Sequence, residues 1–171
     1  MNKTISTDIT DANITNVTAL LADTPLQLER LSRALSSEQL CQPLAFGERS
    51  FSEDLAHLIH TEARSSEAIY LALLMEEPLF PDIHPERQWG KLLRFDVLAF
   101  PDLLDYFNLR RIVLLRVLSS LTKEQWQRSI REDGKKRKES VYWRARTIAM
   151  HELEHLSNLQ NKLDHFSHPK P

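Results

Sequence analysis

Residues 148–156 read Ile-Ala-Met-His-Glu-Leu-Glu-His-Leu, and they show the helical period of the last long segment of the chain. Apolar residues recur three or four positions apart on both sides of this stretch, which places them on one face of an α-helix. Within the stretch, His151 and His155 are four residues apart, so their imidazoles lie on one helix face, one turn apart. Both side chains can therefore reach one divalent cation without any rearrangement of the backbone.

The same period predicts three further long helices. Apolar stripes indicate helices over about residues 12–35, from about Ser52 to the residue before Pro78, from Pro101 to about Leu118, and over about residues 140–165. Only three glycines occur, and no alternating strand of useful length is present. The sequence thus predicts an all-α fold: a four-helix bundle with an additional short helix and a long loop after the second helix.

Local signals refine this arrangement. Pro25 interrupts the first stripe, and Thr24 before it can act as an N-cap, so a break or kink near Asp23 is expected. Thr122-Lys123-Glu124-Gln125 reads as a capping box that starts the short helix. Residues 76–92 are rich in proline and aromatic residues, and so long a loop inside a compact domain is usually functional or packed over something.

The composition is that of one globular domain. The 171 residues fit a single domain, with residues 1–11 and 166–171 expected to be flexible ends. A formal net charge of -2 gives no long-range attraction for nucleic acid or anionic lipid. No apolar stretch approaches the roughly 18 to 20 residues that span a bilayer, and the N-terminus lacks the features of a signal peptide. With Cys41 as the only cysteine, no intramolecular disulfide can form, and a cytoplasmic location is expected.

Two further histidines stand on the second helix, in Leu55-Ala56-His57-Leu58-Ile59-His60. Neutral imidazole is the commonest metal ligand, and one of these two would complete a three-nitrogen set with His151 and His155. Three protein ligands leave a coordination position open for water or substrate, whereas a closed structural site takes four ligands, usually with cysteines. On a helical wheel both His57 and His60 sit away from the apolar stripe, so the residues alone leave that choice open.

Two glutamates accompany the histidines. Glu152 lies near the centre of the apolar stripe of the last helix, and Glu62 follows the histidines of the second helix. Since an unpaired buried carboxylate is costly, Glu152 is expected either to neighbour a metal or to reach the end of the bundle. In an enzyme, Glu152 or Glu62 would orient a ligand or exchange protons.

The order of these parts resembles the DinB-like (damage-inducible) family of metal-binding four-helix bundles. The matching pieces are Leu55-Ala56-His57-Leu58 with Glu62, then Ser-Leu-Thr-Lys-Glu-Gln-Trp at residues 120–126, then His151 and His155 before Leu156 and Gln160. The resemblance extends from about Leu20 to Leu163.

The resemblance implies both a metal site and a class of function. In that family one histidine of the second helix and the pair on the last helix hold a divalent ion, which here implies His57, His151 and His155. Relatives often carry an aspartate where this chain has His60, which leaves open an exchange between His57 and His60 or a fourth contact. The family includes thiol-dependent transferases and many members without assigned activity.

A metal-dependent thiol transferase or hydrolase acting on a small molecule is therefore expected. Zn or Ni is the expected cation, although imidazole suits Zn, Ni, Cu and Fe alike and does not by itself choose between them. A homodimer is expected by analogy with such folds. The alternative is a non-enzymatic, metal-stabilised bundle that acts as a sensor or assembly module.

The letters H-E-x-x-H also occur in zinc metalloproteases, where the glutamate serves as the base. Those enzymes take a third ligand downstream, and only residues 156–171 follow His155. The metzincin continuation needs a glycine and a histidine where this chain has Asn158 and Asn161. No strand is expected that could align an extended peptide. The sequence therefore disfavours a protease.

Overall fold

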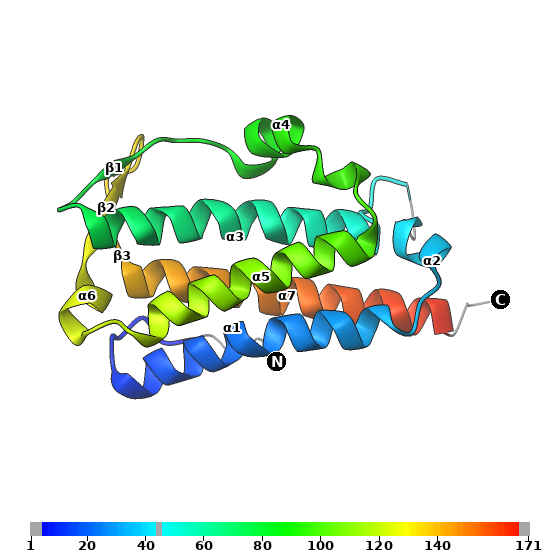
Figure 1. Ribbon diagram of the computed structural model, residues 1–171, viewed down its shortest axis with the longest axis horizontal. Coiled ribbons are helices and arrows are strands. Elements are labelled where there is room, and N and C mark those ends of the chain that lie inside the picture. The colour runs from blue at the N-terminus through cyan, green and yellow to red at the C-terminus, as the bar shows by residue number, and fades with distance from the viewer. Residues whose placement is uncertain (1–4, 44–45, 168–171) are drawn as a thin grey trace.

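The computed structural model describes residues 5–43 and 46–167. Four long helices lie side by side along the length of the molecule (Figure 1), which confirms the predicted four-helix bundle. These helices are α1 (Asp11–Ser32), α3 (Phe51–Leu74), α5 (Phe100–Ser119) and α7 (Val141–Ser167). The shorter helical segments are α2 (Ser37–Cys41), a π-helical turn (Pro85–Gly90), α4 (Lys91–Leu93), a 3-10 turn (Phe95–Val97) and α6 (Lys123–Gln127). No helix in this described part of the chain is long and apolar enough to cross a membrane.

The sequence predicts a break or kink near Asp23; helix α1 continues through Pro25, so the break is wrong. Proline has no backbone N–H, and the carbonyl of Leu21 therefore lacks its helical hydrogen bond. The guanidinium of Arg111 on α5 donates to that carbonyl over 2.5 Å. Because a tertiary contact satisfies the group that proline cannot, the helix does not need to end there.

Capping boxes fix where α3 and α6 begin. The side chain of Ser50 accepts from the backbone N–H of Glu53, while Glu53 accepts from the N–H of Ser50, so α3 starts before the predicted Ser52. Thr122 forms the predicted capping box with Gln125 at the start of α6.

A small three-stranded sheet joins the connections at one end of the bundle (Figure 1). β1 (Leu79–Phe80) pairs in parallel with β2 (Ser129–Glu132), and β2 pairs antiparallel with β3 (Glu139–Ser140). The sequence does not predict these strands, because strands of two to four residues are too short to show an alternating pattern. The basic run at residues 134–138 is exposed in the connection between β2 and β3.

The predicted long loop at residues 76–92 contains β1 and the π-helical turn, and this turn packs on α3. At Gly90 the turn lies close to α3, because an added Cβ there would lie 3.1 Å from Cε1 of His60. Phe95, a little further along, stacks on the ring of His60 with the ring centroids 5.1 Å apart. The segment therefore covers α3 beside the histidines.

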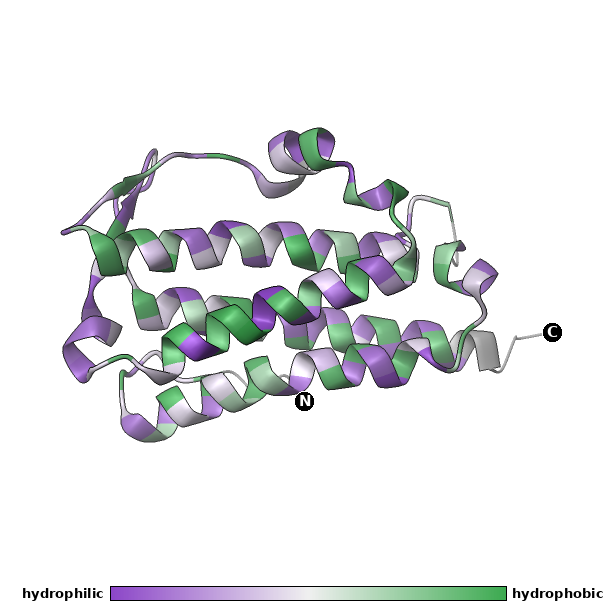
Figure 2. Cartoon of the chain, in the orientation of Figure 1, coloured by the Kyte–Doolittle hydropathy of each residue, from purple (hydrophilic) through white to green (hydrophobic). Residues whose placement is uncertain are grey.

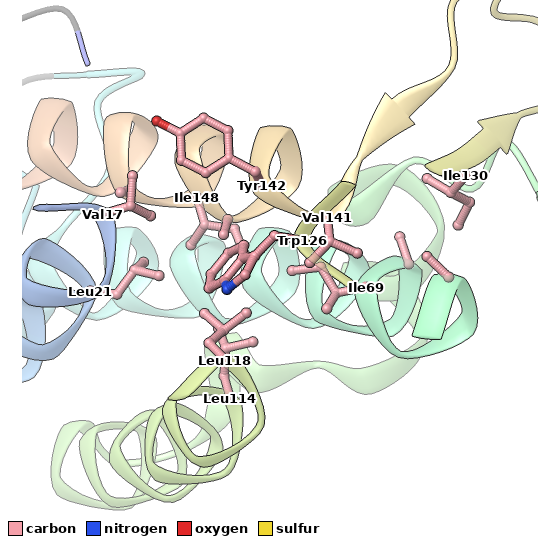
Figure 3. Packing of buried hydrophobic residues seen from close by; sticks show 14 of the residues in the cluster. Val17, Leu21, Ile69, Leu114, Leu118, Trp126, Ile130, Val141, Tyr142 and Ile148 are labelled. Carbon is pink, nitrogen blue, oxygen red and sulfur yellow. The ribbon is translucent and has the colours of Figure 1, made fainter. Parts of the chain in front are cut away.

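Two apolar clusters form the core, and apolar and polar residues alternate around the long helices (Figure 2). The first cluster includes Val17, Leu21, Leu114, Leu118, Trp126 and Tyr142 (Figure 3). The second includes Leu28, Leu55, Leu58, Leu103, Phe107, Leu156 and Leu159.

Buried polar residues stand between the two clusters along every long helix. We call them the polar layer: Thr24 on α1, Glu62 and Ser66 on α3, Arg111 on α5 and Glu152 on α7. Each lies, in sequence, between the residues that its helix gives to one cluster and those that it gives to the other. The bundle is thus two apolar halves separated by paired polar groups.

Part of the expected flexible N-terminal end packs against α7. Ile5 is 5% exposed, and its carbonyl accepts from Nε of Arg146 over 2.8 Å. The hydroxyl of Tyr142 donates to the carbonyl of Ser6 over 2.8 Å. Of the two expected flexible ends, residues 1–4 and 168–171 lie outside the described residues, and residues 166–167 belong to α7.

Candidate metal centre

Three histidines meet where α3 packs on α7. His57 stands on α3, and His151 and His155 stand one turn apart on α7. One ring nitrogen from each lies within 4.8 Å of the others, and Nε2 of His57 is 3.1 Å from Nε2 of His151. Two nitrogens bound to one tetrahedral Zn²⁺ at ordinary bond lengths are about 3.3 Å apart. The structure therefore brings these three residues together at a spacing that fits a shared cation.

The charge state of His151 also suits a cation. Burial lowers the pKa of His151, and the neighbouring His155 lowers it further. A lowered pKa keeps the imidazole neutral near pH 7, and the neutral ring is the form that binds a metal ion.

Asp54 is a candidate site residue that the sequence analysis does not single out. Its Oδ1 lies 3.4 Å from Nδ1 of His155, and its Oδ2 accepts from Nζ of Lys162. Burial alone would raise the pKa of Asp54, but the close approach of the His155 ring and the hydrogen bond from Lys162 hold that pKa below its usual value. A carboxylate at Nδ1 fixes the ring and leaves Nε2 to face a metal. The sequence could have indicated Asp54, because it lies three residues before His57 and therefore on the same face of α3.

His60 does not join the histidine group. Its side chain is buried against Gly90 on one side and stacks on Phe95. Between the two histidines that the sequence left open, the geometry therefore favours His57 as the ligand from α3.

Glu152 is likewise outside the group, although it lies between His151 and His155 in the sequence. Arg111 donates to both carboxylate oxygens of Glu152, and the two side chains are 2% and 1% exposed. The sequence predicts that Glu152 either neighbours a metal or reaches the end of the bundle. In the structure Glu152 is instead buried in the polar layer, where both its oxygens accept from Arg111. The sequence analysis did not identify Arg111 as the partner of Glu152. This ion pair offsets the cost of burying the carboxylate, and because Arg111 lies on α5, the sequence of α7 alone does not predict it.

Glu62, the other glutamate expected from the sequence, is also buried and lines a cavity together with His151. Its Oε2 accepts from Nε of Arg110 over 2.6 Å, and its side chain is 1% exposed. Among the described residues, its Oε1 has no hydrogen-bond partner. Glu62 and His151 line the same cavity of 240 Å³. A carboxylate with one unpaired oxygen beside a histidine of the group can accept or donate a proton there.

Each histidine of the group faces a hollow. His57 lines a cavity of 280 Å³, His151 the cavity shared with Glu62, and His155 a cavity of 700 Å³. Basic side chains border the cavity at His57, namely Arg49, Lys91 and Arg94. Each of the three histidines therefore borders a cavity large enough for a small molecule.

Fold and site together define a helical bundle whose candidate metal centre lies between two of its four long helices. Residues 20–159 match the sequence profile of the DinB superfamily, and the chain belongs to that superfamily. No curated protein sequence matches the chain.

Two solved structures from Bacillus subtilis share the fold. YfiT, described as a probable metal-dependent hydrolase with an unusual four-helix bundle topology, superposes with a TM-score of 0.84 at 16% identity, over 95% of this chain and 92% of YfiT. The DinB-like protein YjoA superposes with a TM-score of 0.64 at 16% identity, over 91% of this chain and 94% of YjoA. At such low identity the likeness shows the fold alone.

Proposed function

We propose that this chain is a metal-dependent enzyme that acts on a small molecule, with His57, His151 and His155 holding one divalent cation. The observation that carries the proposal is the convergence of three ring nitrogens within 4.8 Å of one another beside cavities of 280 and 240 Å³. Three protein ligands leave a coordination position for the reacting molecule. The likeness to YfiT, described as a probable metal-dependent hydrolase, favours hydrolysis over thiol transfer as the reaction to test first.

The chain's own residues divide the remaining work. A bound divalent cation supplies Lewis-acid chemistry, polarising an oxygen or a thiol of the small molecule. Asp54 orients the ring of His155, and Glu62 exchanges a proton at Oε1 toward the cavity that it shares with His151. Glu152, with both oxygens bound by Arg111, holds α7 in place and takes no part in proton exchange.

Zn or Ni is the cation that we propose, because a set of imidazole nitrogens suits both metals. A homodimer and a cytoplasmic location stay predictions made from the sequence.

Metal analysis of single variants tests the ligand set. Wild-type protein is expected to hold about one equivalent of metal per chain, and His57→Ala, His151→Ala and His155→Ala each to lose it. His60→Ala is the matched control, since it removes an imidazole three residues from His57 on the same helix. Full occupancy in the His57 variant together with loss in the His60 variant would show that the ligand choice is wrong.

Turnover separates the enzyme from the non-enzymatic alternative. Metal-loaded protein is expected to hydrolyse members of a panel of small esters, amides and phosphoesters, and Glu62→Gln to lower kcat by about a hundredfold or more with metal occupancy unchanged. If no substrate of the hydrolase or thiol-transfer panels turns over although metal is bound, the sensor or assembly module becomes the better description.

A further inference from the structure

Arg49 lies at the start of α3, directly before the N-cap residue Ser50. Its carbonyl accepts a hydrogen bond from Nζ of Lys162, so its backbone is fixed between α3 and α7, the two helices that carry the histidines. Its half-buried side chain lines the cavity at His57 and also the cavity at His155. The side chain of Arg49 is therefore held beside two of the three histidines.

The charge of Arg49 also reaches the third histidine. Burial and the neighbouring His155 are the larger causes of the lowered pKa of His151, and the positive charge of Arg49 lowers that pKa further. The guanidinium thus lies within electrostatic range of His151 as well. A molecule bound at the candidate centre would lie close to this one cationic side chain.

The cavity of 280 Å³ at His57 has more basic than acidic side chains. Its charged lining residues are Arg49, Lys91, Arg94, Glu53 and Asp96. Asp96 is paired with Arg94 over 3.0 Å, and Oε2 of Glu53 accepts from the N–H of Ser50 over 2.7 Å at the start of α3. Three basic and two acidic residues leave one positive charge over in this cavity.

The charges around the histidines do not offset that excess. Among the described residues, every buried carboxylate of α3 and α7 already has a basic partner. The pairs are Asp54 with Lys162, Glu62 with Arg110, and Glu152 with Arg111. Neutral imidazoles add no negative charge, so a divalent cation held by three of them would keep both of its positive charges. Metal centre and cavity together therefore favour an anionic molecule.

We propose that the small molecule acted on at the candidate centre carries an oxyanion, a carboxylate or a phosphate, and that Arg49 binds this group in the cavity at His57. A planar guanidinium donates two parallel hydrogen bonds to either group, which fixes the orientation of the molecule as well as its charge. Lys91, exposed on α4, adds a second positive charge at the same cavity. The inference rests on the proposed metal site and specifies which molecules that site takes.

Matched hydroxamate probes test the proposal by isothermal titration calorimetry on the full-length, metal-loaded protein. A hydroxamate binds a divalent cation through its two oxygens, and succinic acid monohydroxamate carries in addition a carboxylate that its methyl ester lacks. The wild type is expected to bind the carboxylate probe about tenfold to a hundredfold more tightly than the ester, because the contact with Arg49 is a charge-assisted hydrogen bond. A phosphonate probe of the same chain length shows which oxyanion is preferred, since the tighter of the two anionic probes identifies the group.

Arg49→Met tests the assigned residue, because it removes the guanidinium and leaves the carbonyl that accepts from Lys162. This variant is expected to bind the carboxylate probe about tenfold more weakly than the wild type and the ester equally well, which also shows that its metal site is intact. Arg33→Met, at an exposed arginine beyond the end of α1, is the matched control and is expected to bind both probes as the wild type does.

Two kinds of failure are distinguishable. Equal affinities of the wild type for the carboxylate and ester probes, or an Arg49→Met variant that keeps the full preference, would overturn the assignment of Arg49 and leave the metal site standing. Failure of all three probes to bind would mean that no coordination position is open, and the proposed function would fall together with this inference.

Discussion

At the scale of the residue, the candidate centre depends on side chains outside the three histidines. Asp54 contacts His155 on one side and Lys162 on the other, so the carboxylate joins α3 to α7 as well as orienting a ring. A ligand whose ring is already held in place loses less conformational freedom on binding metal than a ring that rotates. In the proposed metal site, the position of Asp54 would therefore contribute to the affinity for the cation.

Asp54→Asn is expected to weaken metal binding by about tenfold to a hundredfold, because an amide is a weaker acceptor for the N–H of His155 than a carboxylate. Competition with a chromogenic chelator measures the affinity. Glu53→Gln is the control one position away, since glutamine can keep the capping contact with Ser50. Equal affinities for Asp54→Asn and wild type would remove Asp54 from the site.

A second contact at this scale joins three of the long helices at the polar layer. Arg111 bonds both oxygens of Glu152 and also the carbonyl of Leu21, so three helices meet at one guanidinium. Arg111→Met leaves the buried Glu152 carboxylate uncompensated and is expected to lower the free energy of unfolding by about 3 to 5 kcal/mol in urea titration.

The paired substitution distinguishes this account from a simple packing defect. In Arg111→Met/Glu152→Leu the buried charge is gone, and much of the lost stability is expected to return, although the carbonyl of Leu21 stays without its donor. A double variant that is as unstable as the sum of its single variants would contradict the coupling.

At the scale of the element, sequence periodicity predicts the four long helices because each one buries a stripe against its neighbours. The sequence also predicts the capping box at Thr122, because its hydrogen bonds join residues only three positions apart. It fails at Pro25 and at Glu152, where the deciding partner is Arg111 on another helix. His57 approaches His151 because α3 packs on α7. The pattern of either helix alone does not predict this contact, and the sequence analysis expected it only from the family resemblance.

The short sheet also depends on partners from distant elements. Glu132 on β2 is 4% exposed and accepts from Arg64 on α3 over 2.7 Å and from Arg144 on α7 over 2.5 Å. Burial alone would raise its pKa, but the hydrogen bonds from these arginines and from Lys135 lower the pKa of Glu132 from 4.5 to about 2. Glu132 therefore anchors β2 to both helices.

This lowered pKa predicts acid sensitivity. The carboxylate binds fewer protons in the folded than in the unfolded chain, so its contribution is present above pH 4.5 and is lost as the pH falls toward about 2. The shift corresponds to at most about 3 kcal/mol at neutral pH. Urea titrations at a series of pH values are expected to show a smaller loss of stability over this window for Glu132→Gln than for wild type. The exposed Glu76→Gln is expected to follow the wild-type curve.

At the scale of the whole molecule, the histidine group joins two helices that other contacts already hold. α3 and α7 both contribute to each of the two apolar clusters, and the polar layer lies between those clusters. A cation at the three histidines would therefore add to a bundle that its core can maintain, unlike the metal of a zinc finger, without which the chain unfolds.

Removal of the metal is thus expected to leave the helices formed. Chelated protein should keep its far-ultraviolet circular dichroism and lose several degrees in Tm, because a cation at 100 times its dissociation constant adds about 2.7 kcal/mol to the folded state. His57→Ala is expected to show the lower Tm with or without metal, whereas His60→Ala should respond to metal as the wild type does. Collapse of the helical signal on chelation would instead mean that the cation is structural, and the site would then belong to a metal-stabilised module and not to an enzyme with an open coordination position.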